Sequence, residues 1–298
     1  MRTSIVVRIL FGLVLCLLFA LQAYAHPGSG IVVNKQGEIF FTDTGRGVWK
    51  IDRQGKLTYL PASRFHWMAL DEAGSFAGSR KSFGEWFERV SPENSIPIII
   101  TCSDFPCTIG RDGNLYYADT RPAAPRIIRR TPDGSESIVA AGEMFQNVSG
   151  IAPGPDGSLY ITDAGRPDAS VIRKIAMDGT ISAIAKVHVS KSGTGNPPPE
   201  TEVSHCRGLV VDSSGVTYVA ATGSRAVLRI TPQGKVSGIL QSEGSWSPTG
   251  VTLFEGEVYV LEWSDSPASQ TEVREAWVPR VRKIGRDGMI TTLATVSR

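Results

Sequence analysis

The chain has 298 residues, of which 41% are hydrophobic and 20% charged, and its 31 basic and 29 acidic side chains give a formal net charge of +2. This composition is that of a globular protein with enough apolar side chains for a sizeable core. A nearly neutral chain lacks the basic surface that nucleic acid demands, so nucleic acid is excluded as a partner.

The first 25 residues have the three parts of a secretory signal peptide. Arg2 and Arg8 precede an apolar run over residues 9–21, which leads to the small-residue site Ala23-Tyr-Ala25. The run is too short for a comfortable membrane span. We therefore expect cleavage after Ala25, a single domain over residues 26–298, no membrane span, and a periplasmic or extracellular location.

Residues 30–60 are the unit from which the rest of the chain is built. This unit predicts four short strands, over 30–34, 38–42, 48–52 and 56–60, joined by three connections that each contain glycine. Runs rich in Val, Ile, Phe and Tyr between such turns are signals of β-hairpins.

The unit recurs with a period of about 40 residues, and four strands per copy at this period are typical of propeller blades. A base lies on the predicted third strand of each copy: Lys50, Arg89, Arg129, Lys174, Arg229 and Lys283. We interpret these bases as structural. The sequence predicts an all-β fold, a six-bladed β-propeller of four-stranded antiparallel blades. The blades are expected over 30–60, 66–101, 106–140, 150–186, 207–240 and 249–296.

No strand is left over at either end of the predicted ring. We expect the ring to close without a strand exchanged between the first and last blades. Removal of residues 26–29 should then cost little, because no strand would be lost.

Phrases such as Gly157-Ser-Leu-Tyr-Ile-Thr-Asp163, followed by Val171-Ile-Arg-Lys-Ile175, resemble NHL repeats. They are also similar to the wider superfamily of gluconolactonase-like six-bladed propellers. The resemblance covers nearly all of the chain after residue 27. It implies the fold and leaves the activity open, because these families share blades and differ in chemistry.

One face of the predicted propeller gathers the long insertions. The first strand of each blade begins there and the second strand ends there, and we call it the mouth face. The insertions at 187–205 and 264–279 both lie on this side. Long loops at one end of a rigid scaffold commonly carry binding or catalysis, so we expect the functional site on the mouth face.

Alignment of the repeats places polar and aromatic residues around the mouth of the axial channel. The residues at the blade starts are Ser29, His66, Phe105, Ser149, Arg207 and Thr249, and acids follow the second strands at Asp43, Asp119, Asp163 and Glu262. An arginine there offers a planar fork of donors to a carboxylate, a phosphate or a pair of sugar hydroxyls. The predicted ligand-binding residues are His66, Trp67, Asp119, Asp163, Arg207, Glu262 and Trp263. We expect a monomer that binds a polar small molecule, a carbohydrate or a protein partner.

A structural role for the acids is the alternative. Aspartates at such strand ends commonly accept backbone hydrogen bonds in the following turn. A nearby arginine often pairs with them, and Arg46, Arg121 and Arg166 are placed to do so.

The resemblance to gluconolactonases also raises the question of catalysis. It implies a divalent cation held by a Glu at the first blade start, Asn residues at later starts and an Asp. The corresponding positions read Ser29, Ser149 and Arg207, so we expect no metal and no cofactor. A zinc site would require three imidazoles to converge, and His66, His188 and His205 are the candidates. The alternative function is a hydrolase or lyase of the lactonase type with a diverged active site. Its catalytic candidates are His66, Arg207 and Glu262.

Three cysteines remain after the signal peptide: Cys102, Cys107 and Cys206. The first two are the obvious pair by sequence. Yet Cys102 ends a predicted outer strand, whereas Cys107 opens the next inner strand, and a disulfide needs Cα atoms within about 7 Å. The sequence leaves this bridge open.

The signal-peptide assignment has a direct test. N-terminal sequencing of the exported protein should begin at His26-Pro27. A lipid-modified N-terminus at Cys16 would contradict both the cleavage site and the expected location.

Overall fold

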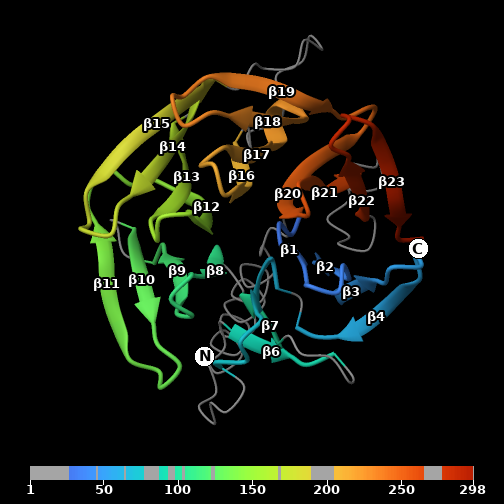
Figure 1. Ribbon diagram of the computed structural model, residues 1–298, viewed down its shortest axis with the longest axis horizontal. Helices are drawn as coiled ribbons and strands as arrows, with labels where there is room; N and C mark the ends of the chain where they lie inside the picture. The colour runs from blue at the N-terminus through green and yellow to red at the C-terminus, as the bar shows by residue number, and fades with distance from the viewer. Residues whose placement is uncertain are drawn as a thin grey trace, which may run out of the picture.

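The computed structural model describes residues 27–44, 46–63, 65–76, 87–92, 98–102, 105–121, 125–166, 169–188, 205–264 and 277–297. These residues form six antiparallel sheets arranged as blades around a central axis (Figure 1). The fold is the predicted all-β six-bladed propeller. No helix in this part of the chain is long and apolar enough to cross a membrane.

Five blades are meanders of four consecutive strands. Blade one contains β1 (Ile31–Val33), β2 (Ile39–Asp43), β3 (Gly47–Ile51) and β4 (Leu57–Pro61). Blade three contains β8 (Cys107–Ile109), β9 (Leu115–Asp119), β10 (Arg126–Arg130) and β11 (Glu136–Ala141). Blade four contains β12 (Val148–Pro153), β13 (Leu159–Arg166), β14 (Ala169–Ile175) and β15 (Ile181–His188).

Blades five and six follow the same plan. Blade five contains β16 (Cys206–Val211), β17 (Thr217–Ala221), β18 (Ala226–Ile230) and β19 (Val236–Gln241), with a short 3-10 helix, η1 (Thr222–Ser224), after β17. Blade six contains β20 (Trp246–Phe254), β21 (Glu257–Ser264), β22 (Val278–Ile284) and β23 (Ile290–Thr295).

Blade two departs from the predicted strand order. Its described strands are β5 (Trp67–Asp71), β6 (Phe87–Val90) and β7 (Ile98–Cys102), and β7 lies between the other two. The prediction that the last strand of this blade is the outermost one was therefore wrong. Ile99 and Ile100 point to opposite faces of β7 and both are fully buried. A strand that is apolar on both faces gains most from a central place in a sheet, which explains why β7 lies between β5 and β6. The insertion expected at 78–86 lies outside the described residues.

The position of β7 also settles the cysteine pairing. Because β7 pairs directly with the inner strand β5, Cys102 lies opposite Trp67 and next to the start of β8. Cys102 and Cys107 form a disulfide with a Cα–Cα distance of 6.6 Å. This bridge joins blade two to blade three, and Cys206 remains a free, buried thiol.

Three of the six repeated bases form ion pairs within their own blades, in agreement with the predicted structural role. Lys50 pairs with Glu38 at 3.0 Å, and Lys283 pairs with Glu257 at 3.0 Å. In blade four Lys174 reaches Asp156 at 2.6 Å. Each pair joins strand three to the tight turn between strands one and two.

Neighbouring inner strands approach one another closely around the axis. A Cβ atom on Gly150 would overlap the carbonyl oxygen of Arg207 in the next blade, and one on Gly250 would overlap that of Ser29. Only glycine allows backbones to pass at this distance.

Side-chain hydroxyls join the blades across these approaches. Ser149 Oγ donates to the carbonyl of Cys206 at 2.7 Å, and Thr162 Oγ1 donates to that of Arg207 at 2.8 Å. Thr222 Oγ1 donates to Pro248 at 2.8 Å. Each bond runs from one blade to the backbone that leads into the next.

Among the residues that the structure describes, the ring closes without an exchanged strand, as predicted: β1–β4 and β20–β23 are separate sheets. However, residues 27–29 form a buried strap that takes part in the closure. The carbonyl oxygen of Gly28 accepts hydrogen bonds from Thr249 Oγ1 (2.6 Å) and Trp263 Nε1 (2.9 Å) of blade six. Its amide donates to Thr44 Oγ1 at 2.7 Å. The expectation that this segment is dispensable is therefore corrected, because side chains can close a ring as well as strands can.

A chain that begins at Gly30 should be less stable than one that begins at Pro27. Buried hydrogen bonds contribute roughly 1 kcal/mol each, and donors left unsatisfied cost about 1–3 kcal/mol. The loss should therefore be several kcal/mol and should appear in urea unfolding midpoints. Equal midpoints for the two chains would show that the strap is not part of the closure.

Candidate ligand-binding site

The acids at the ends of the second strands are bonded within their own blades. Asp163 accepts the amides of Gln146 and Asn147 at 3.1 and 3.0 Å, and it pairs with Arg173 Nε at 3.2 Å. Asp43 accepts from Trp49 Nε1 at 3.1 Å. These contacts agree with the structural role that was the alternative for the acids. The arginine that pairs with Asp163 is Arg173, whereas Arg166 was expected.

Glu262 is likewise held in a closed network. Its side chain is fully buried and pairs with Arg280 Nε at 2.6 Å, while Ser242 Oγ of blade five donates to its other oxygen. The guanidinium of Arg280 also lies over the ring of Trp246, 4.0 Å from its centroid.

The aromatic candidates and His66 lie at blade junctions. Trp263 is 2% exposed and donates to the strap, as described above. Trp67 is partly buried and packs on the core between blades two and three. The carbonyl oxygen of His66 accepts from the amides of Ser29 (2.7 Å) and Gly30 (2.9 Å), which fixes blade one to blade two.

Arg207 links blade five to the strap that leads into blade one. It begins in β16 of blade five, and its Nη1 donates to the carbonyl oxygen of Pro27 at 3.1 Å. Pro27 leads into blade one, and blade six lies between these two blades (Figure 1). Burial lowers the pKa of Arg207 to about 10. Burial also lowers the pKa of the neighbouring His205, and the charge of Arg207 lowers it further.

These predicted site residues do not share one cluster of contacts. Asp119, Asp163 and Glu262 pair with arginines of their own blades, and Arg207 is bonded to the strap. Across the described ranges, no three His, Cys, Asp or Glu side chains are grouped so that they could hold a metal ion. Ligand contact by His66, Trp67, Arg207 and the others stays a prediction.

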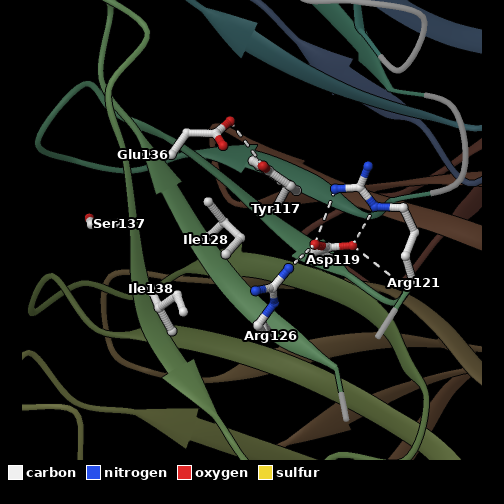
Figure 2. Close-up of a pocket in the computed structure, with 8 residues that line it drawn as sticks. All are labelled: Tyr117, Asp119, Arg121, Arg126, Ile128, Glu136, Ser137 and Ile138. Atoms are coloured by element: carbon white, nitrogen blue, oxygen red, sulfur yellow. Dashed lines mark hydrogen bonds and ion pairs between the residues drawn. The ribbon is translucent and has the colours of Figure 1, made fainter. Parts of the chain in front are cut away.

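An open pocket of about 210 Å³ lies on the flank of blade three. Figure 2 shows the lining residues, which come from β9, β10, β11 and the turn after β9: Tyr117, Asp119, Arg121, Arg126, Ile128, Glu136, Ser137 and Ile138. Tyr117 and Ile128 belong to the core shared with blade two, so this is the blade-two side of the sheet. Asp119 and Arg121 place one end of the pocket at the mouth face.

The mouth-face end is built on Asp119, whose side chain is 2% exposed. Arg121 Nε donates to Oδ1 at 2.8 Å and its Nη2 to Oδ2 at 3.1 Å, while Arg126 Nη2 donates to Oδ2 at 2.7 Å. These bonds, those from Arg121 foremost, lower the pKa of Asp119 to about 2. The carboxylate therefore stays ionised at neutral pH, and it orients two guanidinium groups.

Exposure distinguishes this acid from its counterparts in other blades. The side chains of Arg126 and Arg121 are 38% and 52% exposed, whereas Arg173 on Asp163 is 16% exposed and Arg280 on Glu262 is 14% exposed. Only an exposed guanidinium can meet a ligand from solvent. Blade three thus presents the accessible version of a contact that the other two blades bury.

The far end of the pocket is polar and already neutralised. Glu136 accepts from the Tyr117 hydroxyl at 3.0 Å and pairs with Arg130 Nη1 at 2.7 Å. Burial, followed by the charge of Glu136, raises the pKa of Tyr117, so its hydroxyl remains a donor. Ile128 and Ile138 form the middle, and Ile138 is 58% exposed.

The sequence indicated Asp119 and missed Arg126, Tyr117, Glu136 and Ile138. A signal for Arg126 was present, because Arg280 has the same register in blade six: each arginine pairs across the strands with the acid that ends strand two, Asp119 and Glu262. The six recurring bases lie nearer the ends of the predicted third strands.

No protein-family model matches the chain, and no curated protein matches it. Solved structures do. A gluconolactonase from Xanthomonas campestris is 16% identical, with 80% of this chain and 84% of that chain covered and a TM-score of 0.54. Virginiamycin B lyase from Staphylococcus aureus is 15% identical, with 89% and 83% covered and a TM-score of 0.51.

A third similar structure is the PQQ-bound aldose sugar dehydrogenase from Streptomyces coelicolor, 13% identical, with 80% and 89% covered and a TM-score of 0.55. At these identities the likeness shows the fold alone. The resemblance to gluconolactonase-like six-bladed propellers is thereby confirmed for the fold.

The lowered pKa of Asp119 makes its contribution to stability depend on pH. The folded pKa is about 2 and the unfolded pKa is near 3.9, so the contribution is complete above about pH 4 and is lost as pH falls toward 2. Asp119→Asn should reduce the free energy of unfolding by about 1–2 kcal/mol at pH 7. The difference from the unmodified chain should shrink below pH 4.

Urea unfolding between pH 2 and 7 measures this difference, with Glu143→Gln at an exposed position of the same blade as the control. A stability difference that is independent of pH would contradict the role given to the Asp119 ion pairs.

Proposed function

We propose that this chain is a ligand-binding propeller that holds a small polar molecule in the blade-three pocket, at the edge of the mouth face. The observation that carries the proposal is the pair of exposed guanidiniums fixed by one buried carboxylate over an open pocket. The polar groups are oriented before a ligand arrives, which reduces the ordering cost of binding.

The size of the pocket supports a small ligand or one end of a larger one. Its volume of about 210 Å³ lies below the range of roughly 300–1,000 Å³ typical of sites for drug-sized molecules. A sugar ring, a short carboxylate or the terminus of a peptide are of suitable size. We take a small molecule as the ligand and a protein partner as the alternative.

The place of binding would be outside the cytoplasm. The N-terminal segment supports export by its composition, and the Cys102–Cys107 disulfide fits an oxidising compartment. We propose a periplasmic or extracellular binding protein on this basis.

Catalysis of the lactonase or lyase type is the second candidate. It is favoured by the similarity of the fold to a gluconolactonase and to virginiamycin B lyase. Its candidate residues are His66, Arg207 and Glu262, of which Glu262 would have to leave Arg280 to act. Hydrolysis of glucono-δ-lactone that is lost on chelation and in Arg207→Ala would favour this candidate over binding.

A variant that fills the pocket tests the binding proposal. Ile138→Trp places an indole over Ile128, its partner across β10 and β11. Thr292→Trp is the matched control, because Thr292 is exposed at the equivalent register of β23 in blade six. Ligand-observed NMR with a fragment panel of sugars, lactones and short carboxylates should find ligands for the unmodified chain and for Thr292→Trp. Ile138→Trp should lose them.

Fragments that bind all three chains equally would show that the site lies elsewhere. Fragments lost only in Arg207→Ala would place it at the axial mouth.

A further inference from the structure

We infer that the ligand of the blade-three pocket carries an anionic head group and a short apolar stem; the inference rests on the proposed function. The head would lie on Arg126 and the stem on Ile128 and Ile138.

The charges at the mouth-face end favour an anion. Asp119 contributes one negative charge, and Arg121 and Arg126 contribute two positive charges. Because the pKa of Asp119 is lowered, this balance holds across the physiological pH range. A carboxylate or a phosphate would therefore enter a local positive field.

Arg126 is accessible to such a group. Its Nη2 donates to Asp119, and its side chain is 38% exposed, so a ligand can reach the guanidinium from solvent. A planar guanidinium binds a carboxylate through two parallel N–H donors. The head group would bind the exposed edge of a guanidinium that Asp119 already orients.

The middle of the pocket favours an apolar stem. Ile138 is a large aliphatic side chain that is 58% exposed, and it lies opposite Ile128 on the same face of the sheet. A stem of a few methylene groups would cover both. Each buried methylene contributes favourably through the hydrophobic effect.

The far end disfavours a second negative charge. Glu136 is 42% exposed as a side chain, and its charge is balanced by Arg130. A dianion with a charge at each end would place one charge beside this carboxylate. A ligand with a single anionic head at the Arg126 end therefore fits the charged end, the apolar middle and the Glu136 end of the pocket.

Hexanoate, hexanamide and hexylammonium test this assignment by isothermal titration calorimetry on the full mature chain. The three molecules have the same stem and differ in charge. Hexanoate should bind about ten-fold more tightly than hexanamide, because hydrogen bonds to charged groups are roughly twice as strong as neutral ones. Its affinity should fall as ionic strength rises.

Arg126→Gln should remove the preference for hexanoate over hexanamide. Arg129→Gln is the matched control, because it removes the same charge from the same strand and lies on the opposite face, beside Tyr116. The comparison of the three probes on the unmodified chain does not depend on whether a variant folds.

The outcomes separate the inference from the proposed function. If hexanamide or hexylammonium binds as tightly as hexanoate and Ile138→Trp abolishes binding, the inference is overturned and the pocket remains the site. If hexanoate binds Ile138→Trp as tightly as the unmodified chain, both fail. If no probe binds, the inference fails, and the fragment panel decides the proposed function.

Discussion

The close approach of neighbouring inner strands is the constraint on which the rest of the molecule depends. Gly150 and Gly250 remove the side chains that would separate these strands. Hydroxyls such as those of Ser149 and Thr249 then satisfy the carbonyl groups that lead into the next blade. Because buried backbone carbonyls must be hydrogen-bonded, this contact fixes the spacing and orientation of adjacent blades.

The register position of this contact has a different role in blade five. Arg207 occupies the register position at which Ser149 and Thr249 bond to the following blade. Its longer side chain reaches past blade six to the carbonyl of Pro27. Arg207 is therefore held by the strap, whereas the open pocket lies on the flank of blade three.

The acid at the end of strand two is used in two ways. Asp163 and Glu262 hold arginines that are largely buried, and removing one partner of such a pair typically costs about 3–5 kcal/mol. In blade three the same device holds exposed guanidiniums. The acid–arginine pair that stabilises other blades is exposed to solvent in blade three. There the acid holds the guanidinium groups in place before a ligand binds.

The sequence predicted the propeller because glycine turns and strand-three bases recur in phase. It could not predict the strand order of blade two, since an apolar run such as residues 98–102 fits either a central or an outer strand, and burial on both faces decides. It identified Asp119 from its register. The direction of the Arg207 side chain depends on its contact with the distant Pro27. The exposure of Arg126 depends on how the flank of blade three is covered. Local residue spacing predicts neither.

The most direct test of the binding site is a crystal structure of the mature protein with 4-bromobutanoate, in which anomalous scattering locates the bromine. The account predicts a carboxylate on the guanidinium of Arg126 and a bromine over Ile128 and Ile138. A bromine found at the axial mouth beside Arg207, with the blade-three pocket empty, would contradict it.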